Sequence, residues 1–209
     1  NMFGKNGTHS KLSTACLIRQ LKKFKPDVLH IHNLHDYCIN FPMLVKYIKE
    51  SGVKVYMTLH DCWAFTGHCA YYDAVGCQKW TTGCHDCSQL SRYPKERRDT
   101  SKIMYEKKKS WFNDIPNLTL ITPSLWLKGE VEKSFLKEKE VFVINNGIDL
   151  NVFKPVESDF KKRHNIEDKF LVLGVADYWE ERKGFDTFIK LSNSLDDRFR
   201  IVLVGTDEE

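Results

Sequence analysis

The sequence contains no apolar run that approaches the roughly 20 residues a helix needs to cross a bilayer. Its first residues, Asn1 to Lys5, lack the charged and then apolar layout of a secretory signal peptide. Heptads, solenoid repeats and low-complexity tracts are absent as well. These absences argue against membrane-spanning, secreted and repeat proteins, and the expected location is cytoplasmic.

Two nucleotide-binding signatures are also missing. There is no G-x-x-x-x-G-K-[ST] motif, which argues against a P-loop enzyme, and no G-x-G-x-x-G motif after an apolar run, which weakens the case for a dehydrogenase. What is present is a globular composition, with 42% hydrophobic and 29% charged residues. This apolar content is enough for one sizeable core, in one large domain or two small ones.

The net charge of +4 is modest but unevenly distributed. From Arg92 to Lys109 there are eight Lys and Arg against three Asp and Glu, close to aromatic residues such as Tyr105 and Trp111. A solvated helix face with its aromatic residues in the core is the favoured interpretation. A basic aromatic surface for phosphate or an anionic membrane is the alternative. The excess charge is too small and too local to favour binding of nucleic acid.

Short apolar runs alternate with stretches of helical spacing, which predicts an α/β fold with a parallel, doubly wound sheet. The runs expected to form buried strands are Asp27–Ile31, Val53–Leu59, Leu118–Ile121, Val141–Ile144, Phe170–Val175 and Phe199–Val204. Helices are expected at Ser10–Phe24, Phe41–Glu50, Thr100–Phe112, Ser124–Leu136 and Phe185–Leu195. Ser124 is expected to cap the fourth of these helices, and Ser10 or Thr8 the first.

Polar or small residues follow the apolar runs directly, as in His30-Ile31-His32-Asn33 and Thr58-Leu59-His60-Asp61. Ligands of open α/β sheets bind beyond the carboxyl ends of the strands, so the pattern predicts a binding crevice there. A second feature, Phe153-Lys154-Pro155 before the charged stretch Glu157–Asn165, marks the expected boundary between two Rossmann-like domains.

Five motifs, in this order and spacing, make the sequence similar to retaining glycosyltransferases of family 4. They are Pro26–His32, Thr58–Asp61, Thr122–Leu127, Asn145–Asp149 and Arg182–Gly184. The resemblance implies the GT-B fold, which has two Rossmann-like domains with parallel sheets. Residues 1–154 would be the latter part of the N-terminal, acceptor-side domain, 155–168 the linker, and 169–209 the start of the C-terminal, nucleotide-sugar-binding domain. Both domains would be only partly present, and the chain alone is expected to be inactive.

The resemblance also assigns site residues. His60 matches the family histidine that touches the donor sugar near the reaction centre, and Asp61 is its neighbour. Lys183 matches the lysine that contacts the donor diphosphate, with Gly184 beside it and Arg182 in place of an arginine that the family often has earlier. The remaining residues expected at the acceptor or in the cleft are His32, Asn33, Asn146 and Gly147.

The implied reaction moves a sugar from a nucleotide-sugar donor to a glycan or polyprenyl-diphosphate-linked acceptor, with retention of configuration, in polysaccharide biosynthesis. No cofactor is expected for catalysis, and peripheral contact with the inner face of the membrane is left open. The absence of an Asp-x-Asp pair disfavours the metal-dependent GT-A type of transferase. Two alternatives stay open: a nucleotide-sugar 2-epimerase on the same fold, and a non-catalytic interaction module stapled by zinc.

Five of the seven cysteines lie between Cys62 and Cys87. They belong to a block, residues 62–94, that looks like an insertion of a subgroup building bacterial surface polysaccharides. Cys84-His85-Asp86-Cys87 is a C-x₂-C knuckle. The set expected to bind a structural zinc is Cys69, Cys77, Cys84 and Cys87, with His68 and His85 as alternative ligands.

Reduced thiols are the second interpretation of this block, and disulfides or an iron–sulfur cluster come last. We expect the metal to hold the block because few apolar residues are available to do so. Cys62 is expected beside His60 in the crevice rather than among the four ligands. Cys16 and Cys38 lie in helical patterns and are expected in the core.

His30, His32 and His35 follow the first apolar run and, with Asp36, raise the question of a further metal site. A buried histidine that is satisfied by a hydrogen bond is the more common case when thiols and further carboxylates are not close in sequence. We therefore predict hydrogen-bonded histidines here, with His32 free to face the acceptor.

Overall fold

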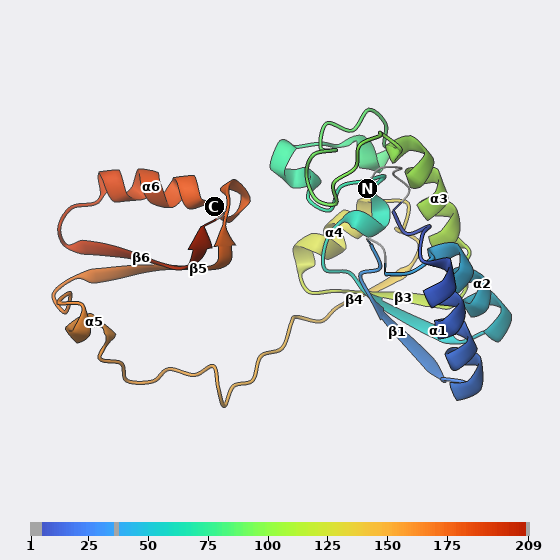
Figure 1. The fold of residues 1–209 in the computed structure, drawn as a ribbon, viewed down its shortest axis with the longest axis horizontal. Coiled ribbons are helices and arrows are strands. Elements are labelled where there is room, and N and C mark those ends of the chain that lie inside the picture. Colours follow the sequence, from blue (N-terminus) through green and yellow to red (C-terminus); the bar gives the residue numbers. More distant parts are fainter. Residues whose placement is uncertain (1–5, 36–37, 208–209) are drawn as a thin grey trace. The chain divides into compact units, whose positions relative to one another are not determined.

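The computed structural model describes residues 6–35 and 38–207 (Figure 1). The chain divides into two compact units, Asn1–Gly147 and Ile148–Glu209. The expected linker, 155–168, falls within the second unit, where Phe160–Arg163 form the short helix α5. In the described part of the chain, none of the helices has the length and apolar character that a membrane span requires.

The first unit is built on a four-stranded parallel sheet in the order β1-β2-β3-β4. The strands are β1 (Val28–His32), β2 (Lys54–Thr58), β3 (Leu118–Thr122) and β4 (Glu140–Val143). His32 lies opposite Thr58 in the register of β1 and β2. The predicted parallel α/β architecture is confirmed, and the ends of β1 and β2 reach the same edge of the sheet.

Four helices complete this unit: α1 (Lys11–Phe24), α2 (Phe41–Ser51), α3 (Ser101–Asn113) and α4 (Leu125–Lys133). In Figure 1, α1, α2 and α3 lie side by side in the order of the sequence. The side chain of Ser124 accepts a hydrogen bond from the Leu127 N–H at 3.2 Å, so the predicted cap of α4 is confirmed.

The predicted capping of α1 by the side chain of Ser10 is wrong. A capping side chain needs an extended backbone at the N-cap, and Ser10 has a left-handed backbone with φ 57°. Its side chain makes no capping bond, and its carbonyl oxygen accepts hydrogen bonds from the N–H and the hydroxyl of Thr14 at 3.0 and 2.7 Å.

The hydrophobic core lies around the two central strands, where Val55, Met57 and Leu120 are fully buried. The prediction that every strand is buried is wrong for β1 and β4, which are edge strands of the four-stranded sheet, and Val28 and Phe142 on them are about half exposed. It is also wrong for the expected strand Phe170–Val175, where Leu173 and Val175 are 56% and 71% exposed. A run of apolar residues signals a strand but does not tell whether a neighbour covers it.

The segment between β2 and α3 folds as a lobe at one end of the sheet (Figure 1). It contains three short 3₁₀ helices: η1 (Trp63–Phe65), η2 (Tyr72–Val75) and η3 (Lys79–Thr81). Phe65 and Tyr72 pack on the ring of Trp80, with centroids 5.3 and 4.6 Å away. The expectation that few apolar residues hold this segment is therefore wrong, because its aromatic residues extend the main core.

The favoured interpretation of the basic segment Arg92–Lys109 holds for Tyr105, which is buried on α3, but not for Tyr93, which is 43% exposed. Lys108, one of its eight cations, is fully buried and does not contribute to a charged surface.

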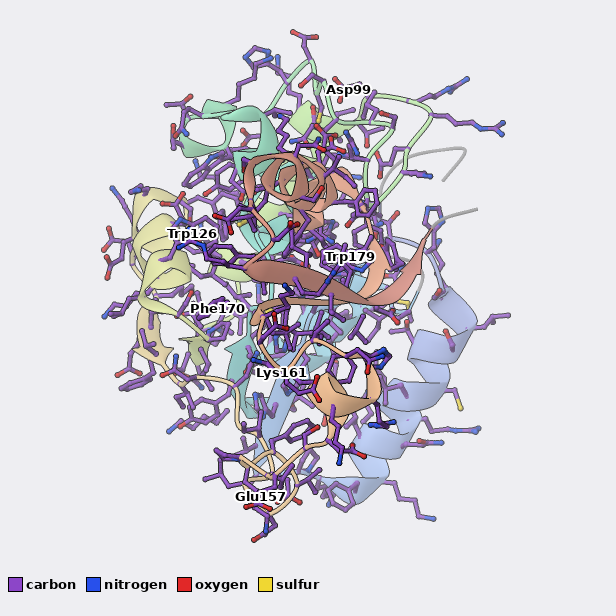
Figure 2. The ribbon with its side chains drawn as sticks, turned by 90° about the vertical axis from the view of Figure 1, so that its left-hand side faces the viewer. Asp99, Trp126, Glu157, Lys161, Phe170 and Trp179 are labelled. Atoms are coloured by element: carbon purple, nitrogen blue, oxygen red, sulfur yellow. The ribbon has the colours of Figure 1, made fainter. Side chains whose placement is uncertain are left out.

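The second unit pairs β5 (Phe170–Trp179) in parallel with β6 (Phe199–Asp207) and adds α6 (Phe185–Ser194). Trp179, labelled in Figure 2, packs against the rings of Phe185 and Phe188 at 6.3 and 5.4 Å. Glycine is required at position 174, because a Cβ there would lie 2.8 Å from both the Trp179 and the Phe188 rings.

We expect Ser124→Ala to lower the free energy of unfolding by about 1 kcal/mol, because α4 loses the acceptor at its N-terminus. Urea unfolding measures the change. Ser124→Asp is the matched control, since its carboxylate keeps an acceptor at the positive end of the helix. Equal stability of the alanine variant and the wild type would contradict the capping role.

Candidate active site at the carboxyl ends of β1 and β2

Polar side chains from the ends of β1 and β2 meet at one edge of the sheet. His32 is the last residue of β1, and His60 follows β2 by two residues. Because the strands are parallel and in register, the segments that follow them leave the sheet together. The structure thus brings together the expected residues His32, Asn33, His60 and Asp61.

His32 and His60 form an imidazole pair. Nδ1 of His32 lies 2.9 Å from Nε2 of His60, and the rings meet edge to edge with centroids 5.2 Å apart and 14° between their planes. A hydrogen bond between two ring nitrogens needs one N–H and one lone pair, so at least one of these two nitrogens is deprotonated. Both residues are exposed, so the pair lies on the surface of the protein at the ends of β1 and β2.

Asn33 joins the two loops through both ends of its amide. Its Nδ2 donates to Oδ2 of Asp61 at 2.7 Å, and its Oδ1 accepts from the backbone N–H of His60 at 3.1 Å. The amide therefore sets the position of His60 relative to β1.

Asp61 is the buried centre of this network, with 8% of its surface exposed. Its Oδ1 accepts from the Trp63 N–H at 2.9 Å, and its Oδ2 lies 3.0 Å from Nε2 of His35. With the bond from Asn33, the carboxylate has partners for both oxygens. This satisfaction is what makes a buried carboxylate tolerable.

His35 and Tyr93 are site residues whose role the sequence did not reveal. Nδ1 of His35 lies 2.9 Å from the Tyr93 hydroxyl, while its other nitrogen faces Asp61. The contact ties the segment between β2 and α3 to the loop after β1. Only the closeness of His35 to His32 in the sequence could have indicated a role for His35 in the site. Its partner Tyr93 is 58 residues away in the chain.

The predicted hydrogen bonding of the histidines is confirmed for His30, whose Nε2 lies 2.8 Å from the Thr58 hydroxyl. Its expected burial is wrong, because β1 is an edge strand and His30 is exposed. Asp36 lies outside the described residues. Among the described residues, no group of three or more His, Cys, Asp or Glu side chains is arranged to hold a metal ion.

Lys108 of α3 supports the loop that follows Asp61. Its Nζ donates to the carbonyl oxygens of Trp63 and Thr66 at 2.7 and 3.0 Å and lies 3.5 Å from the centroid of the Trp63 ring. Burial lowers the pKa of its ammonium to about 7. Its Nζ thus holds two carbonyl groups of this loop, of which that of Trp63 also accepts a hydrogen bond from the Thr66 N–H.

The expected donor-binding residues lie in the second unit. Lys183 ends η4 (Glu181–Lys183), with its Nζ 4.3 Å from the centroid of the Tyr178 ring. Gly184 forms the N-cap of α6 with φ 80°, and Arg182 pairs with Glu180 at 2.6 Å. Lys183 thus stands at the N-terminus of a helix, where backbone N–H groups favour anions.

Asn146 and Gly147 follow β4 and are exposed. Strand β3 lies between β4 and β2, so these two residues do not belong to the network around Asp61.

The four predicted metal ligands, Cys69, Cys77, Cys84 and Cys87, line one small cavity. Cys62 is not in the crevice beside His60 but buried in the core, where its side chain contacts the Tyr72 hydroxyl. The expectation that Cys16 and Cys38 are core residues is also wrong. Cys16 lies on an exposed part of α1, and Cys38 precedes α2, so both are exposed.

A parallel α/β unit with polar groups at the carboxyl ends of its strands defines a Rossmann-like, ligand-binding class of protein. Residues 2–152 match the model of Glycosyltransferase Family 4, which is more than half of the chain. The chain therefore belongs to glycosyltransferase family 4, and its fold is that of a GT-B enzyme.

The chain is also similar to a protein of Escherichia coli (strain K12) named "Putative colanic acid biosynthesis glycosyl transferase WcaC". The two are 34% identical over 132 residues, which cover 60% of this chain. The match spans 32% of the length of that relative, or about a third.

We expect Asp61→Ala to lower the free energy of unfolding by about 2 to 3 kcal/mol, because a buried donor left without its acceptor costs about 1 to 3 kcal/mol. The donors affected are the Trp63 N–H and the Asn33 amide. Urea unfolding measures the loss. Asp73→Ala is the control, since Asp73 is exposed and its removal should change stability by less than about 0.5 kcal/mol. Equal effects of the two substitutions would show that the network is not stabilising.

Proposed function

We propose that the protein is a glycosyltransferase that moves a sugar from a nucleotide-sugar donor to a glycan or polyprenyl-diphosphate-linked acceptor, with retention of configuration. The observation that carries this proposal is the placement of an exposed His60 at the end of β2 in a family 4 chain. The similarity to a colanic acid biosynthesis enzyme supports a role in polysaccharide biosynthesis.

In this proposal His60 contributes at the reaction centre. Its Nε2 faces His32, and its backbone N–H is held by Asn33, so Nδ1 is the atom that would address a sugar hydroxyl. Charge develops on the sugar and on the departing diphosphate as the bond breaks. A contact that is stronger in that state than with the bound substrate raises kcat.

Lys183 is the proposed ligand of the donor diphosphate. A compact cation beside the N-terminus of α6 suits phosphate oxygens, and Gly184 lets the chain turn into the helix. Arg182 already has a carboxylate partner in Glu180 at 2.6 Å, so most of this assignment rests on Lys183. The acceptor is proposed to contact His32 and Asn33, with Asn146 and Gly147 elsewhere along the carboxyl edge of the sheet.

No cofactor is needed for this chemistry. A lipid-linked acceptor would require the protein to work in the cytoplasm at the inner face of the membrane, as a peripheral protein. The exposed cations of the segment Arg92–Lys109 suit such a contact.

The site favours the transferase over the two alternatives. A 2-epimerase would need carboxylates available for proton transfer, whereas Asp61 is buried and engaged with Asn33, His35 and Trp63. A non-catalytic interaction module gives no reason for an exposed, hydrogen-bonded His32–His60 pair.

We expect His60→Ala to lower kcat by about 10²-fold in the intact protein, the scale of losing one electrostatic stabiliser. The donor is first identified by screening nucleoside-diphosphate sugars for release of the nucleoside diphosphate, and NMR of the product gives the anomeric configuration. His164→Ala, outside the site, is the control. An unchanged kcat would remove His60 from the reaction centre, and an inverted product would contradict retention.

We expect Lys183→Ala to weaken binding of the nucleoside diphosphate by about tenfold or more, since a charge-assisted contact contributes about 1.5 to 3 kcal/mol. Calorimetry with UDP and GDP on the intact protein measures the affinity. The matched control is Lys190→Ala, an exposed lysine further along α6. Equal affinity of the wild type and Lys183→Ala would leave Lys183 as an ordinary surface lysine.

A further inference from the structure

A group of sulfur atoms in the segment between β2 and α3 takes no part in the site at the ends of β1 and β2. Cys69, Cys77, Cys84 and Cys87 line one cavity of about 40 Å³. Cys69 follows η1, Cys77 follows η2, and Cys84 and Cys87 follow η3. The chain therefore returns to this cavity after each of the short 3₁₀ helices. The cavity has room for a species of the size of a water molecule or a metal ion.

The wall of this cavity contains an unsatisfied polar group. His68 also lines it and is 2% exposed, and its Nε2 has no hydrogen-bond partner among the described residues. A buried nitrogen without a partner is unusual in a folded protein. Its presence indicates that the cavity holds a polar occupant.

Two polar groups of the chain also lie close to the sulfur atoms of this cavity. Nδ1 of His68 lies 3.7 Å from Sγ of Cys87, and the Gly67 N–H donates to Sγ of Cys84 at 3.1 Å. Donors of this kind are the usual support around metal-binding thiolates.

We propose that Cys69, Cys77, Cys84 and Cys87 bind one zinc ion as a structural site. Four soft thiolates form the closed ligand set that zinc prefers, and binding releases the thiol protons without any oxidant. The described side chains are not already in a coordinating arrangement, so the cysteines rotate toward the cavity when the metal binds. Gly76 and Gly83, at φ 62° and 155°, allow the tight turns that come directly before Cys77 and Cys84.

Such a metal would support the candidate site at the ends of β1 and β2 indirectly. The backbone N–H of Cys87 donates to Asp99, labelled in Figure 2, at 2.7 Å, and Asp99 also accepts from the Ser101 N–H at the start of α3. Lys108 on the same helix holds the Trp63 carbonyl beside Asp61. The proposed zinc therefore joins the loop after β2 to α3, independently of which sugar the protein transfers.

The test is metal analysis of the chain purified without chelator. We expect about one zinc per chain, and cobalt substitution should give the absorption bands of a tetrahedral thiolate site. Cys77→Ser should lose most of the zinc, whereas Cys16→Ser and Cys62→Ser should keep it. Cobalt spectra of the wild type decide the question if a ligand variant fails to fold.

Several outcomes would overturn the proposal. Seven titratable thiols with no bound metal would mean that the cavity holds reduced cysteines only. Thiols that become titratable only after reduction would show a disulfide. Zinc that is lost with His68→Ala and kept with Cys77→Ser would show that the ligand set is wrong.

Discussion

The buried carboxylate of Asp61 is the group on which the arrangement of the candidate site depends. A carboxylate with 8% exposure is tolerated only when its oxygens are satisfied, and here the partners come from separate parts of the chain. Asn33 and His35 belong to the loop after β1, and the Trp63 N–H to the loop after β2. The hydrogen bonds that satisfy the Asp61 carboxylate hold the two loops together. His32 and His60, beside these loops, remain exposed.

A second set of contacts holds the loop after β2 in place. Lys108 holds the carbonyl groups of Trp63 and Thr66, and the rings of Phe65 and Trp80 extend the core of the sheet into the lobe. Tyr72 of this lobe donates a hydrogen bond to Glu130 on α4. The segment between β2 and α3 is thus part of the structural support of the candidate site, and a proposed zinc would add to a lobe that already has an apolar core.

In the proposed function the two units would supply different chemistry. The first presents imidazoles, an amide and a buried carboxylate at the ends of neighbouring strands, which suits orientation of a sugar and transfer of a proton. The second presents Lys183 at the start of α6, which suits phosphate. Membership of glycosyltransferase family 4 gives a reason for both sets of groups to occur in one protein.

The sequence alone determined the α/β class, the order of strands and helices, and the cap at Ser124, because these follow from apolar periodicity and from contacts within a few residues. It also placed His60 and Asp61 after a strand. Only the tertiary structure decided that β1 and β4 are edge strands, that Lys108 and Cys62 are buried, and that His35 joins Asp61 to Tyr93. These features depend on residues as many as 58 positions apart in the chain, and local sequence patterns carry no record of such pairings.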